Sequence, residues 1–373
     1  MLRVKAFVFQ AGMSDPNDWA TLVRRDATAV CEPNLNPRST GDSSGQFCQD
    51  GCFVQESRGS GMRQLAIVLM SVGAVVTGLV WWLWTPDKDR TALEGKYLNR
   101  SGDMIDVAGG RLHVRDSGPP AASRDASAVI FLHGFGASLH TWEPWASTLA
   151  KDLRVIRIDL PGSGLSLPDP TGDYSDARSQ QILLALMDKL GLQRVSLVGN
   201  SIGGRIAWTF AGTHPQRTNK LVLVSPDGFA SPGLIYGKAA EVPALAKLMR
   251  YSLPKALLTM SLKPAYANPA ALTDPLASRY HDLMLAPGNR DALLARMAQT
   301  VLVDPLPILK KITAPTLLVW GEQDGMIPFA NSDDYLKAVA GAKLVSFKGV
   351  GHLPQEEAPA ASIGAVREFL LTP

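Results

Sequence analysis

The feature that most restricts the fold of this chain is an alternation of short apolar runs with longer helical patterns, beginning near residue 101. The runs are rich in β-branched side chains, which is typical of strands. Strands that alternate with helices predict an α/β fold with a mostly parallel sheet covered by helices. Eight strands are predicted, the first two as a hairpin, over residues 103–107, 111–116, 128–132, 154–159, 194–198, 220–225, 315–320 and 343–347.

The fifth predicted strand leads into Gly199-Asn200-Ser201-Ile202-Gly203, and a helix is predicted over 205–211. This pattern fits the G-x-S-x-G nucleophile elbow, a strained turn in which small residues allow close packing and the serine hydroxyl stays exposed. The free N–H groups of the following helix favour a developing negative charge. A glycine-rich turn with a purely structural role is the alternative. In this context Ser201 is predicted to be a nucleophile.

A serine nucleophile needs a general base, and position separates the histidines. His352 lies in a turn directly after the last predicted strand, at the edge of a parallel sheet where active-site groups gather. His214 lies roughly 20 Å along the helix after Ser201, at 1.5 Å per residue, and cannot reach it. His113 belongs to the hairpin and His281 to an inserted region. We predict His352 as the base; a hydrogen-bonded loop histidine is the alternative.

The acid that orients the base is expected on another strand-end loop, between the nucleophile and the histidine in the chain. Asp324 follows the apolar strand over 315–320 and meets both conditions. Its rivals are Glu322 in the same turn and Asp227 at the end of the preceding strand. Asp324 is the predicted acid and Asp227 the alternative.

An oxyanion hole needs two backbone N–H donors, one of them from the residue after the nucleophile, here Ile202. The other is expected from the loop after the third strand, where Phe135 is the predicted donor. His133 precedes the glycine turn of that loop, so it is predicted to brace the loop rather than to transfer protons.

These motifs resemble the α/β-hydrolase fold superfamily over about residues 100 to 371. The resemblance implies a Ser-Asp-His triad, no metal or organic cofactor, and a helical lid after the sixth strand. It rests on five motifs in family order: His133-Gly134-Phe135-Gly136, Asp159-Leu160-Pro161-Gly162-Ser163-Gly164, Gly199-Asn200-Ser201-Ile202-Gly203, Trp320-Gly321-Glu322-Gln323-Asp324 and Gly351-His352.

The resemblance also bears on the reaction. Branches with an aspartate nucleophile, the haloalkane dehalogenases and epoxide hydrolases, do not fit Ser201. The elbow resembles that of C–C bond hydrolases of aromatic ring cleavage, which usually carry an Asn after the His-Gly turn and a Trp after the catalytic histidine. Ser138 to Trp142 and Leu353 stand at these places. A serine esterase is therefore expected, with C–C hydrolysis, acyl transfer to an alcohol and a non-catalytic membrane-tethered binding module as alternatives.

Residues 65–84, LAIVLMSVGAVVTGLVWWLW, carry no charge and are long enough to cross a bilayer core of roughly 30 Å. Tryptophans cluster at the C-terminal end, as at a membrane interface. We predict a single-pass anchor in the lipid bilayer rather than a buried helix or a cleaved signal peptide. Basic residues are few on both sides, so the side of the membrane that holds the catalytic domain stays open.

The remaining segments complete the predicted organisation. Residues 1–61 lack periodicity and are expected to be irregular, and Met62 is a plausible true start. All three cysteines, Cys31, Cys48 and Cys52, lie there without the spacing of a metal site. Residues 85–100 are expected to be a polar linker, 101–228 with 308–373 the core, and 229–307 the lid. A net charge of +3 gives no reason to expect nucleic acid as a partner.

The predicted lid holds stripes of Leu, Met and Ala together with four tyrosines, Tyr236, Tyr251, Tyr266 and Tyr280. Such residues can form an apolar roof over Ser201, although lid packing explains any one of them equally well. An apolar lid beside a membrane anchor indicates a small-molecule acyl substrate of lipophilic character.

Overall fold

The computed structural model describes residues 58–118, 128–230, 236–239 and 241–372. The chain divides into two units, Met1–Ala74 and Val75–Pro373. The three cysteines and most of the segment predicted to be irregular lie outside the described residues.

The first described element is helix α1, Arg58–Leu83. It contains a stretch, Met62–Trp81, that is long and apolar enough to cross a membrane and of which nothing is buried. The helix begins earlier than the predicted 65–84, because its hydrogen bonds continue into the polar residues that precede the apolar run.

A short helix, α2 (Arg90–Tyr97), lies where a polar linker was predicted, and that prediction is wrong for these residues. Asp89 caps the helix by accepting a hydrogen bond from the Ala92 N–H at 2.8 Å. Leu93 and Tyr97, one turn apart, are buried against Leu165, Leu283 and Ala286. Arg90 and Lys96 add polar contacts to the Leu165 carbonyl oxygen and to Asp282, so the helix is held by tertiary contacts that its polar composition conceals.

The eight predicted strands form one sheet in the order β1-β2-β4-β3-β5-β6-β7-β8. The β1–β2 and β2–β4 pairs are antiparallel and all later pairs are parallel. The strands are β1 (Met104–Val107), β2 (Gly110–Ser117), β3 (Ala128–Leu132), β4 (Arg154–Ile158), β5 (Val195–Ser201), β6 (Thr218–Pro226), β7 (Thr316–Gly321) and β8 (Lys343–Phe347).

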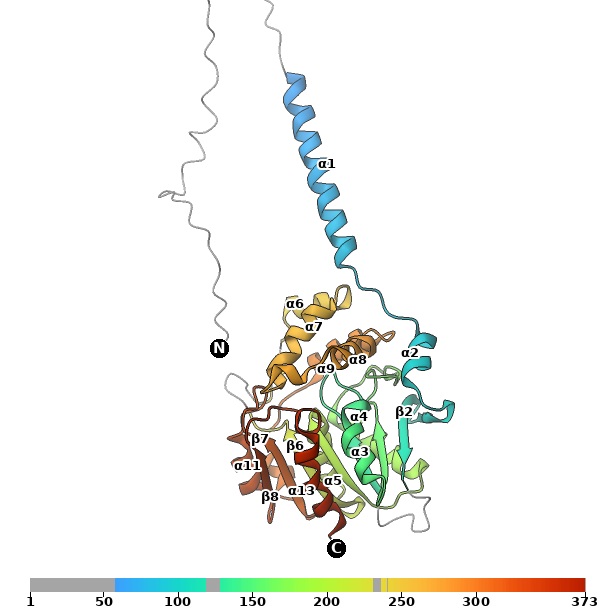
Figure 1. Ribbon diagram of the computed structural model, residues 1–373, viewed down its shortest axis with the longest axis vertical. Coiled ribbons are helices and arrows are strands. Elements are labelled where there is room, and N and C mark those ends of the chain that lie inside the picture. Colours follow the sequence, from blue (N-terminus) through green and yellow to red (C-terminus); the bar gives the residue numbers. More distant parts are fainter. Residues whose placement is uncertain (1–57, 119–127, 231–235, 240, 373) are drawn as a thin grey trace, which may run out of the picture. The chain divides into compact units, whose positions relative to one another are not determined.

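Helices cover both faces of this sheet (Figure 1). The larger apolar cluster lies between one face and α4 (Asp176–Lys189), α5 (Ile202–Thr213), α10 (Leu306–Leu309) and α11 (Asn331–Ala338). The cluster on the other face packs α3 (Glu143–Leu149) and α13 (Pro359–Leu371). Between β8 and α13 lies the short helix α12 (Pro354–Glu357). Side chains in both clusters are close to fully buried, so the central strands are fixed from both sides.

The insertion between β6 and β7 consists of helices, as the resemblance implies. They are α6 (Ala244–Lys247), η5 (Leu248–Arg250), α7 (Lys255–Leu262), η6 (Lys263–Ala265), η7 (Pro269–Ala271), α8 (Asp274–Met284) and α9 (Asn289–Gln299). Buried residues of α7, α8 and α9 form a cluster of their own, which also includes Ala137 from the loop after β3. This lid therefore packs on the loop that is predicted to supply the oxyanion hole.

Candidate active site

Ser201 ends β5 with φ +55° and ψ −122°, and α5 begins at the next residue. Few non-glycine residues adopt positive φ, and such strain collects at functional sites. The surrounding glycines are required by contact: a Cβ on Gly203 would lie 2.2 Å from the Leu132 carbonyl oxygen. The sharp turn thus presses the start of α5 against the end of β3.

The predicted oxyanion loop lies directly against the nucleophile. A Cβ on Gly134 would be 3.3 Å from the Ser201 Cβ and 2.9 Å from the Asn200 Oδ1. Phe135, the predicted donor, follows Gly134 and is exposed, whereas Ile202 is buried at the first position of α5. The backbones of both predicted donors therefore belong to segments in contact with Ser201.

His352 and Asp324 form a close pair. The His352 Nδ1 lies 2.8 Å from the Asp324 Oδ2, and the Asp324 side chain is fully buried. The other carboxylate oxygen accepts hydrogen bonds from the Met326 and Ile327 N–H groups at 2.8 and 2.9 Å. Because the carboxylate is held at both oxygens, it fixes the orientation of the imidazole.

Asn200, the residue before Ser201, ties the elbow to the backbone of His352. Asn200 donates from Nδ2 to the His352 carbonyl oxygen at 3.2 Å and to the Val224 carbonyl oxygen at 3.1 Å. Among the described residues the Ser201 hydroxyl makes no hydrogen bond to the imidazole of His352. In unliganded enzymes such bonds are often long and tighten with substrate.

The rival acids have other partners. The Asp227 carboxylate lies 3.6 Å from the Arg205 guanidinium, and burial raises the pKa of Asp227. Its backbone N–H donates to the Ser201 carbonyl oxygen at 3.0 Å, so this residue braces the elbow. Glu322 is exposed and accepts a hydrogen bond from the Ser346 hydroxyl. The geometry favours Asp324 over both.

Two acidic residues that the sequence reasoning missed join the lid to the histidine loop. Glu357 accepts hydrogen bonds from the N–H groups of Gly351, Ala267 and Asn268. The His352 N–H donates to the Ala265 carbonyl oxygen at 2.7 Å, at the end of η6. The only sign of these contacts in the local sequence is the acidic pair Glu356-Glu357 shortly after His352.

The neighbouring Glu356 corrects the expectation of an apolar roof. Tyr266 and Tyr280 donate their hydroxyls to Glu356 at 2.6 and 3.1 Å, and Arg279 pairs with the same carboxylate. Burial raises the pKa of both tyrosines. Tyr236 and Tyr251 are instead exposed. Two of the four lid tyrosines therefore hydrogen-bond to a buried carboxylate and the other two face outward, because a tyrosine hydroxyl needs a hydrogen-bond partner or water.

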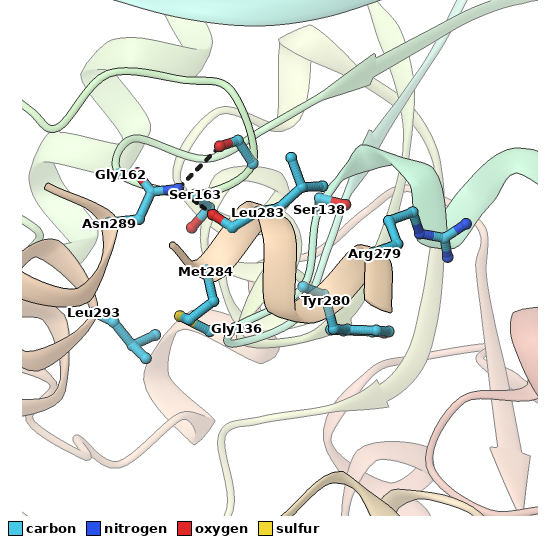
Figure 2. Close-up of a pocket in the computed structure, with 12 residues that line it drawn as sticks. Gly136, Ser138, Gly162, Ser163, Arg279, Tyr280, Leu283, Met284, Asn289 and Leu293 are labelled. Atoms are coloured by element: carbon cyan, nitrogen blue, oxygen red, sulfur yellow. Dashed lines mark hydrogen bonds between the residues drawn. The ribbon is translucent and has the colours of Figure 1, made fainter. Parts of the chain in front are cut away.

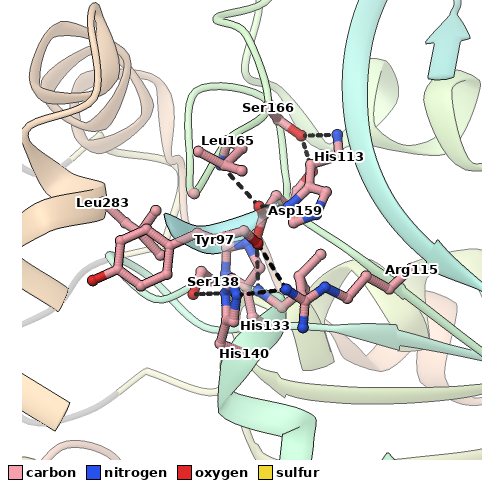
Figure 3. Close-up of polar contacts among 12 residues, drawn as sticks. Tyr97, His113, Arg115, His133, Ser138, His140, Asp159, Leu165, Ser166 and Leu283 are labelled. Carbon is pink, nitrogen blue, oxygen red and sulfur yellow. Dashed lines mark hydrogen bonds and ion pairs between the residues drawn. The ribbon is translucent and has the colours of Figure 1, made fainter. Parts of the chain in front are cut away.

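A second His–Asp pair lies in the same polar cluster as His133 and His140 (Figure 3). The His113 Nδ1 is 2.7 Å from the Asp159 Oδ2, both side chains are fully buried, and Asp159 also accepts from the Leu139 and Leu165 N–H groups. Burial alone would raise the pKa of Asp159, but His113, aided by the neighbouring histidines, lowers it to about 2. This pair fixes loops and has no serine nucleophile.

His133 belongs to the same cluster. Its Nε2 accepts from the Leu160 N–H at 3.0 Å and its Nδ1 lies 2.8 Å from the Gly134 carbonyl oxygen. Because Nε2 accepts this hydrogen bond it carries no proton, and complete burial lowers the pKa of His133. Its predicted bracing role is confirmed.

Two pockets lie between the core and the lid helices, and Ile202 of the elbow lines the second of them. One lies between the loops at 136–138 and 162–164 and helices α8 and α9, where Asn289 donates to the carbonyl oxygens of Gly164 and Leu283 (Figure 2). The other, of about 270 Å³, is lined by Ile202, Arg205, Arg296 and Val301 among others. Within the described part of the chain, no group of three or more His, Cys, Asp and Glu is arranged to hold a metal.

The chain is similar to proteins of known class. Residues 127–359 match the α/β hydrolase fold family. The chain is 31% identical, over 70% of its length and 90% of the relative's, to a 2-hydroxy-6-oxononadienedioate/2-hydroxy-6-oxononatrienedioate hydrolase of Cupriavidus pinatubonensis. A hydrolase of the same name from Paraburkholderia xenovorans is 33% identical over 66% of this chain and 86% of its own.

The solved structures include a similar hydrolase from Pseudomonas aeruginosa, with a TM-score of 0.63 and 28% identity over 73% of this chain and all of that one. The family match covers more than half of the chain and includes the elbow, the acid turn and His352. The chain therefore belongs to the α/β hydrolase fold family.

Proposed function

We propose that this hydrolase cleaves a carboxylic ester through Ser201, His352 and Asp324. One observation carries the proposal: a strained Ser201 lies against the Gly134 turn, in a site whose histidine is oriented by a buried carboxylate. Nucleophile, base and orienting acid come from three different strand ends, the arrangement of a triad on the α/β-hydrolase fold.

The proposed mechanism is acyl transfer to water. His352 accepts the Ser201 proton as the Ser201 Oγ attacks the ester carbonyl carbon, and the N–H groups of Ile202 and Phe135 hold the oxyanion. The protonated His352 then gives its proton to the leaving alcohol. Water, deprotonated by His352, attacks the acyl-serine carbonyl carbon, and His352 returns this proton to the Ser201 Oγ as the bond to the acyl group breaks and the acid leaves. Asp324 keeps the imidazole in the required tautomer and stabilises its charged form.

We further propose that α1 anchors the protein in a membrane and, on the strength of that anchor alone, that the acyl group is lipophilic. Length and composition of Met62–Trp81 support the anchor. Retention of the full chain in the membrane pellet after alkaline carbonate extraction is expected, and release into the supernatant would refute the anchor.

The experiment that tests the ester proposal is turnover of aryl esters of graded acyl length by the full chain in detergent. We expect hydrolysis that rises from short to medium acyl chains, and a fall of roughly 10⁵-fold or more in kcat for Ser201→Ala. Unchanged turnover in the variant would exclude Ser201 as the nucleophile.

C–C bond hydrolysis is the second candidate function. The names of the Cupriavidus and Paraburkholderia relatives favour it. Leu353 after His352 and Ser138 in the loop after β3 weigh against it, because the resembling C–C hydrolases usually carry Trp and Asn there. Dienone ring-cleavage products separate the two: turnover of a dienone in preference to every ester would replace the proposed reaction.

A further inference from the structure

We propose that the outer face of the lid rests on an anionic lipid bilayer. This lid face is formed by Leu245, Leu248, Tyr251, Leu257 and Met260. The inference rests on the proposed anchor and goes beyond it, since it adds a second lipid-contacting surface that belongs to the hydrolase unit itself.

The first observation is exposure. Leu245 is 76% exposed, Leu257 54% and Met260 65%, although all three belong to short lid helices. On α7 the opposite side is buried, where Leu258 packs into the lid cluster. The helix therefore has apolar residues on both sides, and among the described residues only the side of Leu258 is covered by protein. Contiguous exposed apolar side chains mark interaction surfaces.

The second observation is continuity with the candidate membrane span. Trp84 directly follows α1, and its ring stacks on Tyr251 with centroids 5.9 Å apart. The Thr85 N–H donates to the Tyr251 carbonyl oxygen at 3.0 Å, and the Leu253 N–H donates to the Thr85 hydroxyl at 3.1 Å. Trp favours the membrane interface. With Trp84 at the membrane interface, the stacked ring of Tyr251 lies at the same depth in the bilayer.

The connection is reinforced from α9. Arg290 donates to the Thr85 carbonyl oxygen at 2.8 Å and pairs with Asp87 at 2.7 Å. Lys88 pairs with Asp282 of α8 at 2.6 Å. These bonds hold the residues after the span on the lid helices, so the lid face has little freedom to move away from the membrane end of α1.

The positive charge around the lid face favours an anionic bilayer, rather than a second protein chain, as its partner. Residues 238–263 contain five basic residues and one acidic residue, Glu241. Arg250 and Lys255 pair with Asp291 and Asp274. Lys238 and Lys247 are exposed and form no ion pair within the described residues. Cations beside exposed Leu and Met residues suit anionic headgroups and acyl chains.

The test uses the full chain in vesicles of phosphatidylcholine and phosphatidylglycerol, with Cys31, Cys48 and Cys52 replaced by serine. A nitrobenzoxadiazole dye is attached through Leu257→Cys or Met260→Cys, and nitroxide-labelled lipid is added as quencher. The matched control is Leu371→Cys, an exposed leucine at the C-terminal end of α13, which lies at the opposite end of this unit from α6 and α7 (Figure 1).

We expect about twofold quenching at 257 and 260 and almost none at 371, because interfacial side chains lie at the depth of the headgroups. Absence of quenching at 257 and 260 while carbonate extraction leaves the protein in the membrane would overturn the lid contact and leave the anchor intact. Release of the protein by carbonate would overturn both. A dye signal that depends on protein concentration and not on nitroxide lipid would assign the face to a second copy, which also overturns the proposal.

Discussion

At the scale of residues, two carboxylates follow neighbouring strands, and their partners separate their roles. Asp324 is bonded to His352 and to two backbone N–H groups, whereas Asp227 faces Arg205. We predict that Asp324→Asn lowers kcat by about 10⁴-fold, since the amide favours the wrong imidazole tautomer. Steady-state kinetics on the best ester, with circular dichroism to check the fold, measures this.

Asp227→Asn is the matched control. It removes the charge opposite Arg205 but no bond to His352, so a loss of less than about tenfold is expected. A larger loss for Asp227→Asn than for Asp324→Asn would exchange the roles of the two acids.

The sequence was informative about these residues because each follows a recognisable strand and turn. Glu357 could not be found in this way. Its partners Ala267 and Asn268 lie about ninety residues away in the chain and donate from the backbone, which carries no residue-specific signal. The cluster around Asp159 was not predicted either, because its histidines come from separate strands and loops and share no local pattern in the sequence.

At the scale of elements, the elbow depends on the close approach of α5 to β3. We predict that Gly203→Ala costs about 3 kcal/mol of unfolding free energy or more, because the new Cβ meets backbone oxygens that cannot move aside. The contacts would be 2.2 Å to the Leu132 oxygen and 2.6 Å to the His133 oxygen. Denaturant unfolding in detergent, followed by tryptophan fluorescence, gives the change.

Gly364→Ala provides the comparison within α13. No atom lies within 4 Å of its added Cβ, so the substitution is expected to stabilise by about 0.5–1 kcal/mol through helix propensity. Similar effects of the two substitutions would contradict the packing argument.

The regular elements were largely predictable and their ends were not. The predicted 128–132 and 343–347 match β3 and β8. A run of apolar residues marks β3, which is buried throughout, whereas β8 is the edge strand and only partly buried. β5 extends to Ser201 and α5 begins at Ile202, since the elbow keeps the chain extended up to one strained residue. α2 was missed because only two of its side chains, Leu93 and Tyr97, are buried, too few to give an apolar helical period.

At the scale of the whole molecule, buried neutral histidines make stability depend on pH. Burial, with further repulsion by Arg115, lowers the pKa of His140 to about 3 although Asp159 opposes this. The pKa of this histidine is lower in the folded chain than in the unfolded chain, where it is about 6.5. The free energy of unfolding is therefore unaffected by this group above pH ~6.5 and decreases as the pH falls below that value. Between pH 7.5 and 4.5 this histidine is expected to cost about 2–3 kcal/mol.

His140→Gln removes that loss, so its unfolding free energy is expected to fall by about 2–3 kcal/mol less than that of the wild type over the same pH range. His214→Gln is the same exchange at a less buried ring and is expected to change the pH dependence less. Parallel curves for the wild type and His140→Gln would show that His140 does not stay neutral in the fold.

Labelling of the full chain by a fluorophosphonate probe shows whether Ser201 is an activated nucleophile. Such probes phosphonylate activated serines. We predict one labelled peptide, the one that contains Ser201, by mass spectrometry of the wild type, and no label on Ser201→Ala. Equal labelling of both proteins, or a label on another serine, would contradict the account.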